Sequence, residues 1–160
     1  MKTGQDLVDW QRDQYAHDMK YHFDVLSLHK NDRLKHYALH FAKYTGRVAR
    51  GEREDKSLTQ TVVDALLVSL STANTLHQKL VYEQSSKNRT FFIALADASG
   101  RICDSAEKID HQEPFLDAAR TANQDIANLL LDWALSEGSE IQTLLSSRRQ
   151  ELKSRQFFVR

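Results

Sequence analysis

The sequence of 160 residues has little of several features that define other classes of protein. Its single cysteine, Cys103, excludes an internal disulfide and a cysteine-based zinc knuckle. One proline and five glycines leave few sites where the chain must turn. No apolar run reaches the roughly 20 residues of a membrane-spanning helix, and residues 1–10 lack the apolar core of a signal peptide. We therefore expect a cytoplasmic protein without a membrane segment.

Charge is plentiful but balanced, because 22 Lys and Arg residues offset 22 Asp and Glu residues. A net charge of zero gives no overall field that would favour nucleic acid or an anionic membrane. The sequence contains no recognised nucleic-acid module, P-loop, dinucleotide-binding fingerprint or serine-nucleophile motif. Any electrostatic function must therefore come from local clusters of charge.

Apolar residues recur at intervals of three and four along most of the chain, which is the period of an α-helix. This pattern predicts an all-α bundle of about six helices in a single domain over residues 1–160. The segment that follows Ser57 is apolar on more than one face, so we expect its helix at the centre of the bundle. The expected helices cover residues 5–28, 32–50, 58–83, 89–109 and 114–136, and a sixth runs from 139 toward 155.

Several residues carry the signals of helix ends. Asn31 or Asp32 can cap the second helix, and Ser57 with Gln60 forms a capping box for the third. The only proline, Pro114, suits the first turn of the fifth helix, and Gly138 suits its end. The best break in the middle of the chain lies at residues 85–88.

The two halves of the chain resemble each other. Residues 42–48 match residues 96–102 in residue class at most positions, and residues 64–67 match residues 128–131. These matches predict pseudo-repeats over 32–84 and 88–155, a duplicated helical hairpin packed about a pseudo-twofold axis.

One face of the second predicted helix is basic. Its side chains recur at three and four with no acidic residue between them, so they need an acidic or anionic partner unless they form a solvated face. The stripe consists of Arg33, His36, His40, Lys43, Arg47 and Arg50. We therefore consider His40, Lys43 and Arg47 as candidate contacts to a phosphorylated ligand.

Acidic residues gather on the fourth and fifth predicted helices. If these helices form a hairpin, their carboxylates can face one another and supply the oxygen ligands that Mg²⁺ prefers. The alternative is a polar rim in which Arg101 pairs with Asp97 or Asp104. The acidic and polar positions are Asp97, Asp104 and Glu107 on one helix and Asp125, Asn128 and Asp132 on the other.

Two short motifs on these helices carry a resemblance to a known family. Asp104-Ser105-Ala106-Glu107 is followed after 17 residues by Asp125-Ile126-Ala127-Asn128. This arrangement resembles the E-x-x-E and E-x-x-D signature of the MazG-like, all-α nucleoside triphosphate pyrophosphohydrolases. The flanking segments 100–102 and 128–135 are similar to those of the family, and the first half looks like the same two helices again.

The resemblance implies a nucleotide-binding, Mg²⁺-dependent pyrophosphohydrolase with a degenerate site. Its metal ligands would be Asp104, Glu107, Asp125 and Asn128, with Glu107 and Asp125 as the catalytic pair that orients water between the α and β phosphates of a nucleoside triphosphate. The motif departs from the family because both first glutamates are Asp and the last position is the neutral Asn128. In the first half, basic residues such as His40 and Lys43 stand in place of the glutamates.

Two other classes of function fit parts of the sequence. His36 with His40, and Glu107 with His111, have the i, i+4 spacing of transition-metal ligands on a helix. Alternatively, the chain is a non-catalytic helical interaction or oligomerisation protein, because residues 148–160 combine basic side chains with Phe157 and Phe158. We expect a homo-oligomer.

Overall fold

The computed structural model describes residues 5–85 and 89–154, and over these residues it contains helices and no strand. The prediction of an all-α bundle is confirmed. The described residues form seven α-helices and one 3-10 turn, since the first predicted helix is divided in two. The elements are α1 (Gln5–Tyr21), α2 (Phe23–Leu26), α3 (Lys30–Arg50), η1 (Gly51–Arg53), α4 (Leu58–Thr75), α5 (Phe91–Lys108), α6 (Leu116–Ser136) and α7 (Ile141–Lys153).

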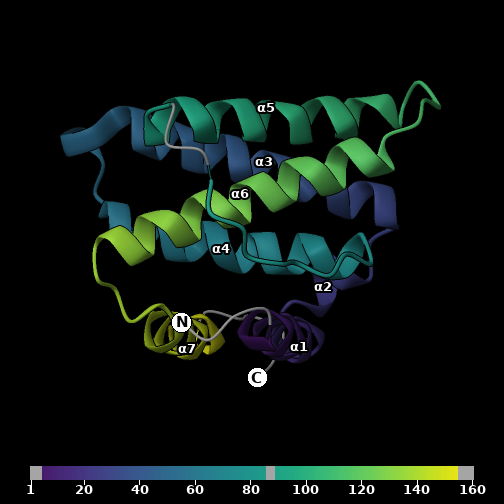
Figure 1. Cartoon of the computed structure of the whole chain (residues 1–160). Helices are drawn as coiled ribbons and strands as arrows, with labels where there is room; N and C mark the ends of the chain where they lie inside the picture. The colour runs from purple at the N-terminus through teal and green to yellow at the C-terminus, as the bar shows by residue number, and fades with distance from the viewer. Residues whose placement is uncertain (1–4, 86–88, 155–160) are drawn as a thin grey trace.

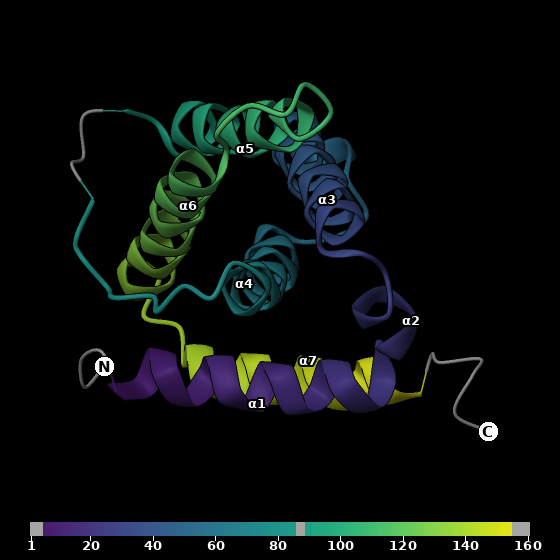
Figure 2. The ribbon, with the colours of Figure 1, turned by 90° about the vertical axis from the view of Figure 1, so that its right-hand side faces the viewer.

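The helices surround α4. Figure 2 shows α3, α5 and α6 around three sides of α4, while α1 and α7 lie side by side along the remaining side. Figure 1 views α1 and α7 end-on and the other long helices lengthwise, so the α1/α7 pair runs across the rest of the bundle.

The central position of α4 follows from its composition. Leu66, Leu70 and Ala73 are each 0% exposed, and buried residues occur on every face of this helix. A leucine buried in this way stabilises the fold by roughly 1.5–3 kcal/mol. The prediction of a central third helix is therefore confirmed.

The first predicted helix, 5–28, is wrong in one respect, because it breaks at His22. The backbone of His22 has φ −131° and ψ 35°, which lies outside the helical region and separates α1 from α2. The chain then turns so that Val25 and Leu26 of α2 face the space between α1 and α3. This break has a functional consequence, because it builds one wall of the pocket described below.

The third predicted helix extends to residue 83, but α4 ends at Thr75. His77 adopts φ 49°, and the N–H of Gln78 donates to the carbonyl of Ala73 at 2.8 Å. This is a Schellman ending with histidine in the left-handed position that glycine usually takes. The sequence pattern misses it because no glycine marks the position.

The other helix ends agree with the sequence in part. Ser57 and Gln60 form the predicted capping box, with hydrogen bonds of 3.1 and 3.0 Å, and Gly138 has the expected positive φ of 62°. The cap of α3 is His29 rather than Asn31 or Asp32, because its Nδ1 accepts from the Asn31 N–H at 3.3 Å. Pro114 precedes the first turn of α6 instead of lying in it. Residues 86–88 of the predicted break, Arg155, Phe157 and Phe158 lie outside the described residues.

Matched positions of the predicted repeat meet across the bundle. Thr45 of α3 and Ser99 of α5 correspond in the two similar segments, and Thr45 Oγ1 donates to Ser99 Oγ at 3.0 Å. The α3/α4 and α5/α6 pairs also pack against each other. The duplication stays a prediction. Separately, among the described helices we find none with the length and apolar character needed to cross a membrane.

Candidate functional site

A pocket of about 270 Å³ lies between α1, α2, α3, α4 and α7. Its size is near the lower end of small-molecule sites, which suits a compact ligand. His40, Lys43 and Arg47 of the predicted basic stripe all line it, together with His36. Arg33 and Arg50 of the same stripe are not among the lining residues. The basic stripe is therefore divided, and only its middle part faces this cavity.

A chain of hydrogen bonds joins three basic side chains on α3. Lys43 Nζ lies 3.0 Å from His40 Nδ1, and His40 Nε2 lies 3.1 Å from His36 Nε2. Because an ammonium group can only donate, His40 Nδ1 must accept the bond from Lys43. We therefore assign the proton of neutral His40 to Nε2, from which it donates to His36.

Burial keeps this group low in positive charge. It lowers the pKa of His40 to about 4, and neighbouring Lys43 and His36 add to the effect. Burial also lowers the pKa of His36 and, together with Arg47, that of Lys43. Both histidines are therefore mainly neutral near pH 7, and Lys43 supplies the positive charge.

Lys43 has no carboxylate partner within 4.0 Å among the residues that the structure describes. Its Nζ lies 4.8 Å from the centre of the Tyr44 ring, so the ammonium rests over an aromatic face. Because Lys43 is exposed and has no carboxylate partner there, its ammonium is open to an anion from solution.

Arg47 differs from Lys43 because it is already paired. Asp64 of α4 accepts from Arg47 Nη1 at 3.2 Å and from Arg148 Nε of α7 at 2.7 Å. Arg148 also donates to Glu151 at 2.7 Å. The two guanidinium groups around one buried carboxylate close this end of the pocket, and they tie α7 to α3 and α4.

Asp18 of α1 lies against the pocket near Ser71 of α4. Its side chain accepts from Ser71 Oγ at 2.6 Å and from Gln14 Nε2 at 2.8 Å. Gln14 in turn accepts from Arg149 Nε at 3.0 Å, so the arginine reaches Asp18 only through the amide. Burial raises the pKa of Asp18, while the two hydrogen-bond donors and the charges of His22 and Arg149 act in the opposite direction.

The remaining wall of the pocket is apolar. Val25 and Leu26 come from α2, Leu67 and Val68 from α4, and Leu152 from α7. The site can therefore hold a molecule with an apolar or aromatic body and polar groups at its edges. Reasoning from the sequence misses Asp18 and Arg148, because they come from α1 and α7 and no spacing along the chain connects them to α3.

The predicted metal ligands on α5 and α6 are not gathered into one set. Asp104 pairs with Lys108 at 2.8 Å, Glu107 with His111 at 3.3 Å, and Asp125 with Arg101 at 2.7 Å. Within residues 5–85 and 89–154, no three His, Cys, Asp or Glu side chains are grouped so that they could hold a metal ion. Each of these carboxylates is already paired with a basic side chain, so this arrangement does not fit Mg²⁺. Magnesium binding stays a prediction.

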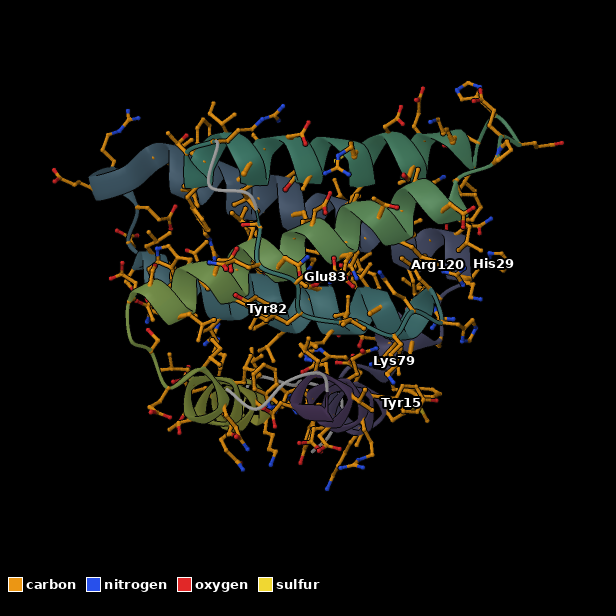
Figure 3. The ribbon with its side chains drawn as sticks, viewed as in Figure 1. Tyr15, His29, Lys79, Tyr82, Glu83 and Arg120 are labelled. Carbon is orange, nitrogen blue, oxygen red and sulfur yellow. The ribbon has the colours of Figure 1, made fainter. Side chains whose placement is uncertain are left out.

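Asn128 has a structural task in this fold. Its Oδ1 accepts from the backbone N–H of Glu83 at 3.1 Å and from Gln124 Nε2 at 3.0 Å. Glu83 belongs to the segment 76–85, which we call the strap and which runs back along α4 and then crosses α6 (Figures 1 and 3). A carboxamide can accept these bonds without placing a further charge beside Asp132.

The strap is held by a row of polar side chains on α6. Arg120 donates to the carbonyl of Leu76 at 2.8 Å, and Asp132 accepts from Tyr82 Oη at 2.6 Å. Gln124 makes two bonds to the backbone of Val81. Together with Asn128, these residues recur every four positions along one face of α6. This period is a signal for the strap in the sequence, although Asn128 and Asp132 also favour the interpretation as a metal site. Figure 3 labels Lys79, Tyr82 and Glu83 on the strap and Arg120, which contacts the beginning of the strap at Leu76.

The alternative histidine sites are also placed by the structure. His36 and His40 face each other through their Nε2 atoms, as described above, whereas Glu107 and His111 pair on the exposed surface near the α5/α6 turn. Neither pair has a third metal-binding side chain grouped with it among the described residues.

Comparison with known proteins adds no assignment. No family model matches the chain, no curated protein is similar to it, and no solved structure matches its fold. The resemblance to the MazG-like family therefore stays a prediction that depends on the motif residues alone.

Proposed function

We propose that this protein binds a nucleotide in the pocket between α1, α2, α3, α4 and α7, with Lys43 and His40 contacting a phosphate group. The observation that carries the proposal is the ammonium of Lys43, which lies exposed on the pocket wall without a carboxylate partner among the described residues, whereas its neighbours Arg47 and Arg148 have one. A phosphate oxygen would supply the missing partner.

The surroundings of Lys43 support an anion over a cation. The pocket carries three permanently or mainly positive side chains, Lys43, Arg47 and Arg148, against the carboxylates of Asp64 and Asp18. Neutral His40 and His36 can accept protons when an anion arrives, which adds positive charge only where it is needed. The apolar wall from α2 and α4 then suits the base of the nucleotide.

Hydrolysis forms a second part of the proposal that rests on the resemblance alone. It predicts release of pyrophosphate from a nucleoside triphosphate by a site that includes Glu107 and Asp125. Because the carboxylates on α5 and α6 are paired with arginine, lysine and histidine side chains, we derive no step through a metal ion there. Binding and hydrolysis are thus separate claims, and each needs its own measurement.

The binding claim is tested by titration calorimetry with nucleoside mono- and triphosphates in the presence of a chelator. We expect Lys43→Met to weaken binding between about 10-fold and 100-fold, the loss of one charge-assisted hydrogen bond. Lys35→Met is the matched control, because Lys35 lies on the same helix but pairs with Asp110 outside the pocket. If no nucleotide binds, or if both variants bind equally well, the proposal is wrong and the non-catalytic interaction protein becomes the better hypothesis.

A further inference from the structure

Asp18 is a buried carboxylate on the wall of the pocket that no lysine or arginine of the described residues neutralises directly. Asp18 is only 5% exposed. No Lys or Arg nitrogen forms an ion pair with it among the residues described, since Arg149 reaches it only through Gln14, and His22 favours its charged form electrostatically. Aspartate is seldom buried so deeply without a permanently charged cation beside it.

The carboxylate is fixed but not saturated. Oδ1 accepts one bond from Gln14 and Oδ2 accepts one from Ser71. Two carboxylate oxygens together offer about four acceptor positions, so each of them can take a further hydrogen bond. Any molecule in the pocket therefore meets a rigid pair of acceptors, and a ligand with hydrogen-bond donors would satisfy them.

The position of Asp18 relative to the basic end sets the shape of the ligand. Asp64, which anchors Arg47 and Arg148, and Ser71, which holds Asp18, are both on α4. They are seven residues apart in the sequence, which is two helical turns or about 10 Å along the axis. Arg47 and Arg148 therefore lie about two helical turns from Asp18, and a ligand in the pocket meets the basic end and the carboxylate with different parts of its structure.

We propose that Asp18 is the group that selects the base, and that it selects guanine. The inference rests on the proposed nucleotide-binding function and extends it. Guanine presents two adjacent donors, the N1–H and the N2 amino group, which match two carboxylate oxygens. Adenine and cytosine place a ring acceptor beside the amino group, and that acceptor would face a carboxylate oxygen unfavourably.

The first test uses the unmodified full-length protein and needs no variant. Calorimetry with guanosine, inosine and xanthosine monophosphates compares bases that differ only at position 2, where inosine lacks the amino group and xanthine has a carbonyl. We expect guanosine monophosphate to bind at least tenfold more tightly than the other two. Equal affinity for all three would overturn the selection of guanine while leaving nucleotide binding intact, and no binding of any of them would overturn both proposals.

The second test replaces the carboxylate of Asp18, which only accepts hydrogen bonds, with an amide that both accepts and donates them. In Asp18→Asn the amide oxygen can still accept the N1–H, while the amide nitrogen donates to the carbonyl of xanthine. We expect the preference to reverse, so that xanthosine monophosphate binds at least tenfold better than guanosine monophosphate. Asp13→Asn, an exposed position on the same helix, should keep the original preference. If Asp18 only fastens α1 to α4, its variant would weaken both ligands alike, and that result would contradict the proposal.

Discussion

Lys43 Nζ and His40 Nδ1 are 3.0 Å apart, and this contact determines where the next proton of the pocket can go. The Lys43 ammonium donates to Nδ1, the nitrogen of neutral His40 that carries no proton. Protonating His40 therefore requires Lys43 to move away or an anion to bind beside it. Without an anion in the pocket, His40 therefore resists protonation, and a bound anion would favour the protonated form of His40.

This relationship predicts a pH dependence of stability. The pKa of His40 is about 4 in the fold, against 6.5 for an unperturbed histidine, so the unfolded state binds more protons between these values. The free energy of unfolding must then fall as the pH drops from 6.5 toward 4, and His17, with a pKa of about 4, adds to the fall. Denaturant titrations of the wild type at about pH 7 and about pH 4.5 measure the loss.

The contribution of His40 can be isolated with His40→Gln, which cannot be protonated. We expect the variant to lose less stability than the wild type over the same pH interval, by on the order of 1–2 kcal/mol after allowance for solvent screening. Identical losses in the two proteins would show that the fold does not suppress protonation of His40.

The cluster around Asp64 predicts a large effect of one substitution. Asp64→Asn leaves Arg47 and Arg148 largely buried without their shared carboxylate, which should cost about 2–4 kcal/mol of unfolding free energy. Asp104→Asn removes an exposed pair with Lys108 and should cost less than about 1 kcal/mol. Chemical denaturation measures both, and similar small losses would mean that the Asp64 cluster contributes little to the fold.

The strap provides a local prediction. In Asn128→Ala the backbone N–H of Glu83 loses its acceptor, so the stability should fall by about 1–2 kcal/mol and hydrogen exchange at Glu83 should accelerate. Thr121→Ala, an exposed change on the same helix, is the control and should leave exchange unaltered. Unchanged protection of Glu83 in Asn128→Ala would exclude Asn128 as its anchor.

Metal binding and hydrolysis can be tested on the chain without knowing the ligand. Because the carboxylates on α5 and α6 are paired with basic side chains, the protein without nucleotide should show no rise in melting temperature in millimolar Mg²⁺. The resemblance predicts instead that pyrophosphate is released from nucleoside triphosphates in the presence of Mg²⁺ and that Glu107→Gln and Asp125→Asn abolish the release. Release that persists in both variants would exclude these two residues as the catalytic pair.

The helical period is enough to predict the fold, and local chemistry explains where it is insufficient. The period places α3 to α6 well because their apolar faces repeat at three and four. It runs past the end of α4 because the ending depends on His77 in a left-handed conformation, which histidine marks far less clearly than glycine does.

The same contrast applies to the site. His40, Lys43 and Arg47 can be grouped from the sequence since they share one face of one helix. Asp18 and Arg148 cannot, because their place in the pocket depends on how α1 and α7 cross the bundle. The motif alone suggests a weak metal ligand at Asn128, whereas its amide holds the strap, a contact made across 45 residues of sequence.

The pocket takes its walls from the first and the last helix described, α1 and α7, and this has a consequence for its assembly. During synthesis the basic face of α3 is made long before Arg148 and Leu152 exist to cover it. The binding site can close only when α7 docks beside α1, so it should form after the α3/α4 part of the pocket. A ligand that bridges α1 and α3 would then stabilise the newly made protein once α7 has docked.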